Sequence, residues 1–319
     1  MGGMLAELGK NLAERWLSLL VLPGALYLAV VATARALGHC HPFDLQRLTS
    51  QITEWANAPA AGTAGGQVVL LASVLVGAAA VGLAAQALGS LAEQVHLAAD
   101  WHTWPAGARH LSHRATASRQ IRWGTAAEEW YRRRDEAAVA RASGSRVNPA
   151  ARYAARAAMT RISPERPERP TWSGDRIHAV AVRLERDYHL DLAALWPHLW
   201  LILSDSTRTE ITAARQALTR ATTLTAWALL YLALAAWWWP GTAIAAVLAV
   251  TSWRRTRTAA DIYATLLEAA VRLHARDLAN HLGLDPAGPL THESGDALTR
   301  HLTTSPPPRP PDDAPVIGT

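Results

Sequence analysis

The stretch WWWPG, residues 237 to 241, lies at the centre of the most apolar part of the chain. The 33 residues around it, Ala221 to Trp253, contain no charged side chain. One helix of that length would measure about 50 Å at 1.5 Å per residue, too long for a bilayer, and Pro240 would remove a backbone hydrogen bond at its centre. We therefore predict a membrane hairpin of two helices that turns at Pro240 and Gly241.

The residues that flank this hairpin indicate where the two membrane surfaces lie. Tryptophan favours the headgroup level, where its ring is in apolar surroundings and its N–H is hydrated. Trp237, Trp238 and Trp239 therefore predict the outer interface, and the inner interface is predicted at four basic residues: Arg220, Arg254, Arg255 and Arg257. The second arm has only about 13 residues, so a re-entrant hairpin that does not reach the far side stays an alternative.

Two further uncharged runs, Trp16–Ala34 and Val68–Leu88, contain 19 and 21 residues. Each is long enough to cross the hydrocarbon core, which takes about 20 residues of helix. The first run exceeds the apolar core of about 7–15 residues that a cleaved secretory signal usually has, so we expect it to be retained. The sequence thus predicts an all-α integral membrane protein with four transmembrane helices.

The distribution of basic residues predicts the orientation of these spans. The connection 38–66 has one basic residue, Arg47, whereas residues 93–220 carry twenty arginines against fourteen acidic residues, a net charge of +6. Because basic loops stay in the cytoplasm, the large connection and both termini are predicted there. The 30 arginines against the single Lys10 indicate a GC-rich bacterial genome.

These features divide the chain into segments. They are a membrane region 1–92 with spans at about 16–36 and 68–89, an arginine-rich cytoplasmic segment 93–170 ending in a Pro-rich linker, cytoplasmic amphipathic helices 171–220, the hairpin 221–253, a cytoplasmic helix 254–284, and a partly disordered Pro-rich tail 285–319.

Helix signals are frequent in the predicted cytoplasmic segments. Thr125–Glu128 and Thr207–Glu210 have the spacing of a capping box. We expect the first to begin a helix that ends before Gly144, and the second to begin a helix that continues into the third span. Between them, SPERPERP (163–170) predicts an extended, exposed linker, and four apolar residues at helical spacing predict an amphipathic helix: Ile177, Val180, Leu184 and Tyr188.

A further helix, Thr258–Leu282, is predicted to end at Gly283 and to carry an apolar face formed by Ile262, Leu266, Ala269 and Leu273. The segment LAALWPHLWLIL (192–203) is too short to span a membrane. It is predicted either to pack in a core or to lie in the inner interface through Trp196 and Trp200; a ligand role for His198 is disfavoured.

Several residues suggest binding sites but have simpler interpretations. His39, Cys40, His41 and Asp44 are too closely spaced to converge on one metal ion, so we interpret them as loop residues. Arg132, Arg133 and Arg134 are flanked by four acidic residues, which favours a solvated helix face over anionic lipid and disfavours nucleic acid. We predict no metal site and no cofactor.

The chain contains no G-x-S-x-G, H-E-x-x-H, Walker or G-x-G-x-x-G motif, so no catalytic residue is assigned. The predicted spans also have no ionisable residue in their interiors, which argues against a proton-coupled transporter.

Four quoted stretches carry a resemblance: TWSGDRIHAV (171–180), LERDYHLDL (184–192), ALWPHLWLIL (194–203) and WWWPG (237–241). With them, residues 171 to about 284 resemble a group of uncharacterised multi-pass membrane proteins of actinobacteria such as streptomycetes. The resemblance implies a bacterial inner-membrane location and a shared architecture, and it brings no known activity.

The sequence therefore predicts a membrane anchor or scaffold whose helical cytoplasmic module binds a protein partner or forms a homo-oligomer in the lipid bilayer. The main alternative is an oligomeric pore or membrane-disrupting effector, with a path lined by Ser18, Thr33, Ser73 and Gln86. A membrane-embedded enzyme with an unassigned site is the third possibility.

Overall fold

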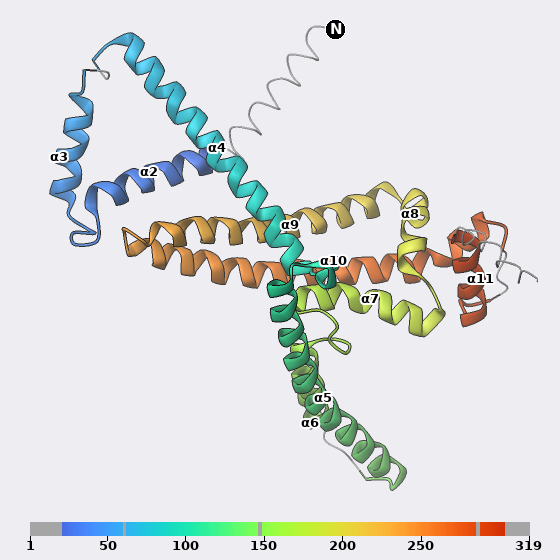
Figure 1. The fold of residues 1–319 in the computed structure, drawn as a ribbon. Coiled ribbons are helices and arrows are strands. Elements are labelled where there is room, and N and C mark those ends of the chain that lie inside the picture. The colour runs from blue at the N-terminus through green and yellow to red at the C-terminus, as the bar shows by residue number, and fades with distance from the viewer. Residues whose placement is uncertain (1–20, 60–61, 146–148, 285–287, 304–319) are drawn as a thin grey trace, which may run out of the picture. The chain divides into compact units, whose positions relative to one another are not determined.

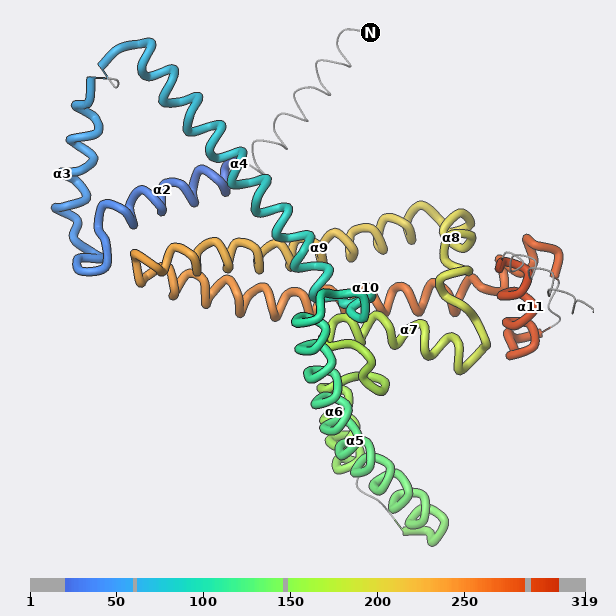
Figure 2. The backbone as a smooth tube through the Cα atoms, in the orientation of Figure 1, coloured from blue at the N-terminus to red at the C-terminus, as the bar shows by residue number. Residues whose placement is uncertain are grey.

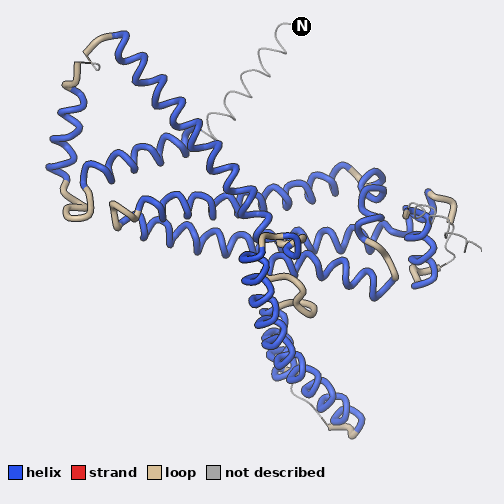
Figure 3. Tube along the Cα trace, viewed as in Figure 1, coloured by secondary structure: helices blue, strands red, loops and turns tan. Residues whose placement is uncertain are grey.

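The computed structural model describes residues 21–59, 62–145, 149–284 and 288–303, and these form helices joined by loops, with no strand among them (Figures 1 and 3). The all-α prediction is confirmed. The elements are α2 (Leu22–Leu37), α3 (Leu45–Ala56), α4 (Ala64–Leu97), the short 3-10 helix η2 (Trp101–Thr103), α5 (Ala106–Ala142), α6 (Ala150–Ile162), α7 (Trp172–Tyr188), α8 (Leu192–Ile202), α9 (Asp205–Leu234), α10 (Pro240–His281) and α11 (His292–Leu302).

The chain forms two compact units, each built from separate stretches of sequence. Unit 1 comprises residues up to Arg122, 167–174 and 214–260, and unit 2 comprises 123–166, 175–213 and the residues from Asp261 onward. Four helices, α5, α7, α9 and α10, contribute residues to both units.

In unit 1, α2 packs on α4 where both helices have small residues (Figure 2). A Cβ atom on Gly24 would overlap the backbone carbonyl of Ala78, so the two backbones can approach closely only because this residue is glycine. A separate cluster joins α2 to the hairpin arms of α9 and α10, where Leu234 is fully buried among aromatic and aliphatic neighbours. Tyr27 of α2 donates a 3.1 Å hydrogen bond to the carbonyl oxygen of Leu230.

In unit 2, a leucine-rich core joins α7, α8, α9, α10 and α11. Its fully buried members include Leu184, Leu199 and Leu298. The ends of the surrounding helices are well capped, since Asp191 accepts a 2.8 Å bond from the amide of Ala193 and Thr291 forms a capping box with Ser294. The segment 192–203 therefore packs in a core, as one of the two sequence interpretations held.

The helix boundaries confirm some sequence predictions and correct others. As predicted, α9 continues without a break into the apolar segment, and α5 ends just before Gly144, whose φ is +72°. The helix expected to begin at Thr125 instead begins at Ala106, because residues 106–124 contain no helix breaker after Pro105 and the capping-box spacing occurs inside a continuing helix.

The linker 163–170 lacks regular secondary structure, but it is not exposed as predicted. Ser163 is fully buried and Pro167 is buried as well. In unit 2 the indole of Trp123 donates to the carbonyl oxygen of Ser163 at 3.0 Å, and in unit 1 Gln120 donates to that of Pro167 at 2.8 Å and Trp101 to that of Glu168 at 3.1 Å. Side chains of neighbouring helices thus satisfy the carbonyls that the proline-rich backbone leaves open.

Among the described residues, two helices, α4 and α9, are long and apolar enough to cross a membrane by length and composition. The helix α2 has 16 residues and is shorter than a typical span, and the apolar part of α10 leads directly into Arg254 and Arg255. Residues 16–20 of the first predicted span and the tail from 304 lie outside the described part of the chain.

Candidate functional site

The surface of α4 is the most unusual feature of unit 1. Its apolar segment exposes seven aliphatic side chains by 47 to 70%, namely Val68, Val69, Leu70, Leu71, Val74, Leu75 and Val76. Four of them are consecutive, so they point in all directions around the helix and not along one stripe. Since none of the described residues of unit 1 covers these side chains, this surface suits apolar surroundings.

The three tryptophans lie in the turn between α9 and α10, and they differ in environment. Trp238 is 9% exposed and its indole N–H donates to the carbonyl oxygen of Pro42 at 3.3 Å. Trp237 and Trp239 are about half exposed, and Phe43 packs edge-on against Trp239. Trp238 therefore holds the turn against the loop after α2, while its two neighbours face outward.

Pro240 and Gly241, where the turn was predicted, are the first two residues of α10. Proline suits a first helical position because its missing N–H would have no partner there. A Cβ on Gly241 would lie 3.0 Å from the carbonyl oxygen of Tyr231, so glycine allows the two arms to approach.

The four predicted basic anchors are also placed differently from one another. Arg220 on α9 and Arg254 and Arg255 on α10 are exposed. Arg257 is half-buried, with its guanidinium 4.2 Å from the ring centre of Trp172 and 5.4 Å from that of Trp253. These cation–π contacts fix the side chain of Arg257 at the end of the apolar part of α10.

Polar residues connect α4, α9 and α10 near the C-terminal end of α4. His96 of α4 lies 3.3 Å from the hydroxyl of Thr225, which lies 2.7 Å from that of Ser252, which donates to the carbonyl oxygen of Ala221. Nearby, Arg215 pairs with Glu93. The sequence analysis missed this network because its members are scattered over 160 residues and share no motif.

A groove of about 780 Å³ between α4 and α9 is lined by the Arg215–Glu93 pair and by Gln86, Ser90, Arg220 and Thr223. Gln86 was one of the residues proposed to line a pore. Two others, Thr33 and Ser73, donate their hydroxyl hydrogens to carbonyls of their own helices at 2.9 and 2.7 Å. Ser18 lies outside the described residues.

On unit 2, the apolar face of α10 predicted from the sequence lies mostly outside the core, although Leu266 packs partly against it. Ile262 and Leu273 are 50 and 71% exposed, and Leu266 and Ala269 between them are at least partly exposed. We call these four residues the α10 stripe. The opposite face, with Ala264, Leu267 and Val271, faces the core. The spacing of the stripe, four, three and four residues, is that of a helix face that packs on another helix.

The segment LAALWPHLWLIL also has an outer side. Trp196 and Trp200 pack partly against the core with their ring centres 5.7 Å apart, while Leu201 is 74% exposed and His198 bonds only within its own helix, to the carbonyl of Ala194. Neither tryptophan is fully exposed.

The remaining sequence candidates have structural roles. Asp44 caps α3 by accepting a 3.0 Å bond from the amide of Arg47, and Cys40 is exposed. No group of three metal-ligating side chains converges among the described residues. In the arginine triplet, Glu129 accepts from Arg132 and Arg133, and these hydrogen bonds lower the pKa of the Glu129 carboxyl below its usual value.

The sequence analysis missed α3. Its exposed Leu45, Ile52 and Trp55 recur at helical spacing, a signal that could have identified an amphipathic helix in this connection.

No protein-family model matches the chain, and comparisons with curated proteins and with solved structures gave no significant match. The functional interpretation therefore depends on the physical properties of the two units.

Proposed function

We propose that this chain is an integral protein of a bacterial cytoplasmic membrane, held by unit 1, and that unit 2 is a helical module for protein interaction. The observation that carries the proposal is the exposure of valine and leucine on all sides of α4. At about 25 cal/mol per Å², such an area in water would be strongly unfavourable, and lipid contact removes that cost.

The proposal includes four membrane segments: residues 16–36, α4, the last part of α9 and the first part of α10. Two of them are long and apolar enough by themselves among the described residues. The other two are shorter, but α2 packs on α4 and the start of α10 packs on α9, so a spanning neighbour supports each. The charge distribution then favours both termini in the cytoplasm.

Cys40 provides the topology test because it is exposed and is the only cysteine. In intact spheroplasts, a membrane-impermeant maleimide is expected to label Cys40 without lysis. Cys40→Ser carrying Ser206→Cys, on the predicted cytoplasmic side, serves as the control and should be labelled only after lysis. The reverse pattern would overturn the orientation, and recovery of the protein in a carbonate wash would overturn membrane insertion.

The interaction surface proposed for unit 2 is the α10 stripe, and its proposed occupant is a helix of a second copy of the chain. Asp261, which also pairs with Arg176 but keeps 57% of its side chain exposed, flanks the first end of the stripe, and Arg276 flanks the last. Two antiparallel copies would therefore place opposite charges near each other. Four residues at heptad-like spacing are typical of such pairing.

This surface can be tested by crosslinking in a Cys40→Ser background. Ala269→Cys, near the middle of the stripe where two antiparallel copies would meet, is expected to give a crosslinked species of twice the chain mass in membranes, whereas Leu201→Cys, which is exposed on α8, is expected to give none. A crosslinked species that contains a different protein would mean that the stripe binds another partner and not a second copy of the chain. Equal crosslinking of both variants, or of neither, would refute the stripe as the interface.

A further inference from the structure

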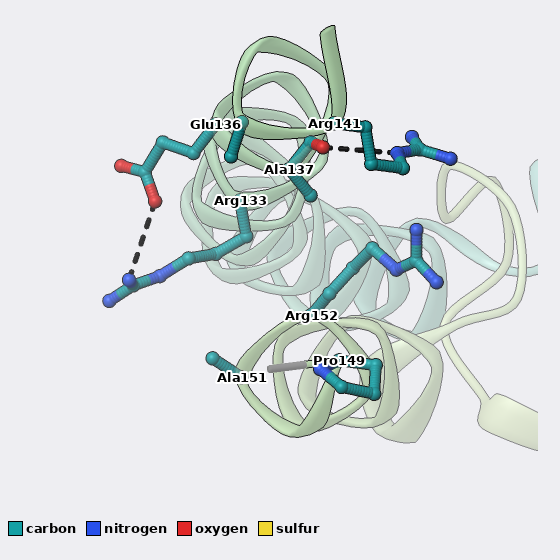
Figure 4. A pocket seen from close by; sticks show the side chains of 8 residues that line it. Arg133, Glu136, Ala137, Arg141, Pro149, Ala151 and Arg152 are labelled. Carbon is teal, nitrogen blue, oxygen red and sulfur yellow. Dashed lines mark hydrogen bonds and ion pairs between the residues drawn. The ribbon is translucent and has the colours of Figure 1, made fainter. Parts of the chain in front are cut away.

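A strongly basic hollow lies between α5 and α6 in unit 2. It has a volume of about 310 Å³ and is lined by Trp130, Arg134, Arg141, Arg152, Tyr153 and Arg156. We call it the basic hollow. A neighbouring hollow of about 450 Å³ shares Arg141 and Arg152 with it, and there these two side chains lie on one side and the Arg133–Glu136 pair on the other (Figure 4).

The charge of the basic hollow is not balanced by carboxylates. No acidic residue is among the described residues that line it, and none of its four arginines takes part in an ion pair there. Two acidic side chains of α5, Glu129 and Glu136, bind Arg132 and Arg133 instead. In the triplet Arg132–Arg134, the first two arginines are therefore paired with carboxylates as the sequence predicted, whereas Arg134 is not.

The arginines are held by contacts that leave most of their donors open. Arg134 lies over the ring of Trp130 at 5.8 Å and Arg152 over that of Tyr153 at 5.4 Å. Stacking uses the flat face of a guanidinium and leaves its N–H groups in the plane. Arg141 donates only its Nε to the carbonyl oxygen of Ala137, at 3.0 Å. Three partly ordered guanidinium groups, together with that of Arg156, thus line one small space.

From this arrangement we propose that the basic hollow binds a phosphate-bearing anion with at least two negative charges. A guanidinium fork matches the spacing of phosphate oxygens and forms paired, charge-assisted hydrogen bonds with them. The volume, at the lower end of the range of about 300–1,000 Å³ typical of ligand pockets, admits a small phosphate group and not a folded partner. The site belongs to unit 2 alone and does not depend on membrane insertion.

The test uses inorganic pyrophosphate as the probe and the full-length protein in a neutral detergent at low salt. Titration calorimetry is expected to detect binding by the native protein. Removing two of the unpaired charges in Arg134→Gln/Arg156→Gln should weaken it by about tenfold or more, because each lost fork removes charge-assisted bonds. The matched control is Arg132→Gln, two positions before Arg134 on the same helix. The charge of Arg132 is already paired with Glu129 and Glu136, so its loss should weaken pyrophosphate binding less than about twofold.

A second double variant distinguishes loss of a site from loss of the fold. Arg134→Lys/Arg156→Lys keeps the charge and should retain measurable binding, weaker than native, because lysine lacks the fork. Absence of pyrophosphate binding by the native protein, or an equal loss in Arg132→Gln, would overturn the proposal.

A competition arm identifies the source of the phosphate. Short-chain phosphatidate that displaces pyrophosphate would assign the hollow to a lipid headgroup. Displacement by a soluble phosphomonoester but not by phosphatidate would assign it to a soluble compound. Both results support phosphate binding, and the same titration on the double glutamine variant must show the loss in either case.

Discussion

The two units differ in the balance of small and large side chains that they bury, although unit 1 also buries Leu218 and Leu234 and unit 2 also buries Ala264 and Ala275. Unit 1 brings its helices together through small residues, including Gly24, Ala34, Ala78, Gly82, Ala85, Gly89 and Ala226, and turns valine and leucine of α4 outward. Unit 2 buries leucine and valine, including Val180, Leu184, Leu190, Leu195, Leu199 and Val271. Small residues at helix contacts are typical of membrane proteins, because moving leucine from lipid into a protein interior yields no hydrophobic free energy. A core of buried leucine and valine is typical of a protein folded in water.

The largest effect predicted from this contrast is in the core of unit 2. Leu199 is fully buried among the helices of that core, so Leu199→Ala removes packed methyl groups and leaves a cavity. We expect a loss of about 2–5 kcal/mol in the stability of unit 2, measured as the urea dependence of its proteolysis in the full-length protein. Leu201→Ala, two positions along and 74% exposed, should cost less than about 0.5 kcal/mol. Equal losses would mean that α8 does not define a core.

A matched pair of valines tests the contrast from the other side. Val76 on α4 and Val139 on α5 are each 70% exposed, so they differ in proposed surroundings and not in coverage by the protein. Val76→Arg should oppose membrane insertion by about 2.5–3.5 kcal/mol, the cost of arginine near the centre of a spanning helix. Val139→Arg adds a charge to a hydrated surface and should be nearly neutral.

The readout is the fraction of protein that resists carbonate extraction from membranes at equal expression. A decrease with Val76→Arg alone is expected. If both variants stayed in the membrane equally well, the exposed surface of α4 would not face lipid, and the comparison between the units would lose its main support.

Two glycines sharpen the comparison, because the same substitution is expected to have opposite signs. A methyl group on Gly24 would overlap the carbonyl of Ala78, so Gly24→Ala should separate α2 from α4 and cost about 1–3 kcal/mol. Gly124, inside α5, has open space around its Cβ position, so Gly124→Ala should stabilise the helix by about 0.5–1 kcal/mol. Thermal unfolding of the two variants checks both signs, and a stabilised Gly24→Ala would show that α2 does not pack there.

Much of this fold follows from the sequence because the deciding signals are local. The uncharged stretch 221–253 with its central Pro240 indicates paired helices, and Gly144 and Gly283 end helices where glycine permits a positive φ. The single amphipathic face of residues 177–188 likewise predicts α7, whose Val180 and Leu184 are fully buried.

What the sequence did not predict depends on contacts between distant residues. The linker 163–170 contains nothing but turn formers and charges, and its burial follows from donors such as Trp123 and Trp101 on other helices. Arg134 has no carboxylate partner because Glu129 and Glu136 bind the two preceding arginines, and because α6 brings further arginines to this place. No local sequence pattern gives either of these facts. The α10 stripe was recognised as apolar, but the sequence alone does not say which of two apolar faces the core takes.

The smallest predicted effect concerns pH and the surface of unit 2. Asp187 on α7 accepts a 2.8 Å bond from Arg272 of α10 and a 3.2 Å bond from Arg186. These hydrogen bonds, that of Arg272 foremost, hold the pKa of the Asp187 carboxyl below its usual value. Because the folded pKa is the lower one, the pair stabilises unit 2 above the ordinary aspartate pKa of about 4, and this stabilisation is lost as pH falls through the folded value.

The side chains of Asp187 and Arg272 are each 33% exposed, so solvent screening should keep the effect below about 1 kcal/mol. Asp187→Asn is therefore expected to lower unit 2 stability slightly at pH 7 and to match the native protein once the pH is low enough to protonate the native carboxyl. Asp205→Asn is a suitable control, since its side chain is 97% exposed and pairs only with Arg208 of its own helix. A deficit in Asp187→Asn that persisted at low pH would mean that packing at this position, and not its charge, holds α7 to α10.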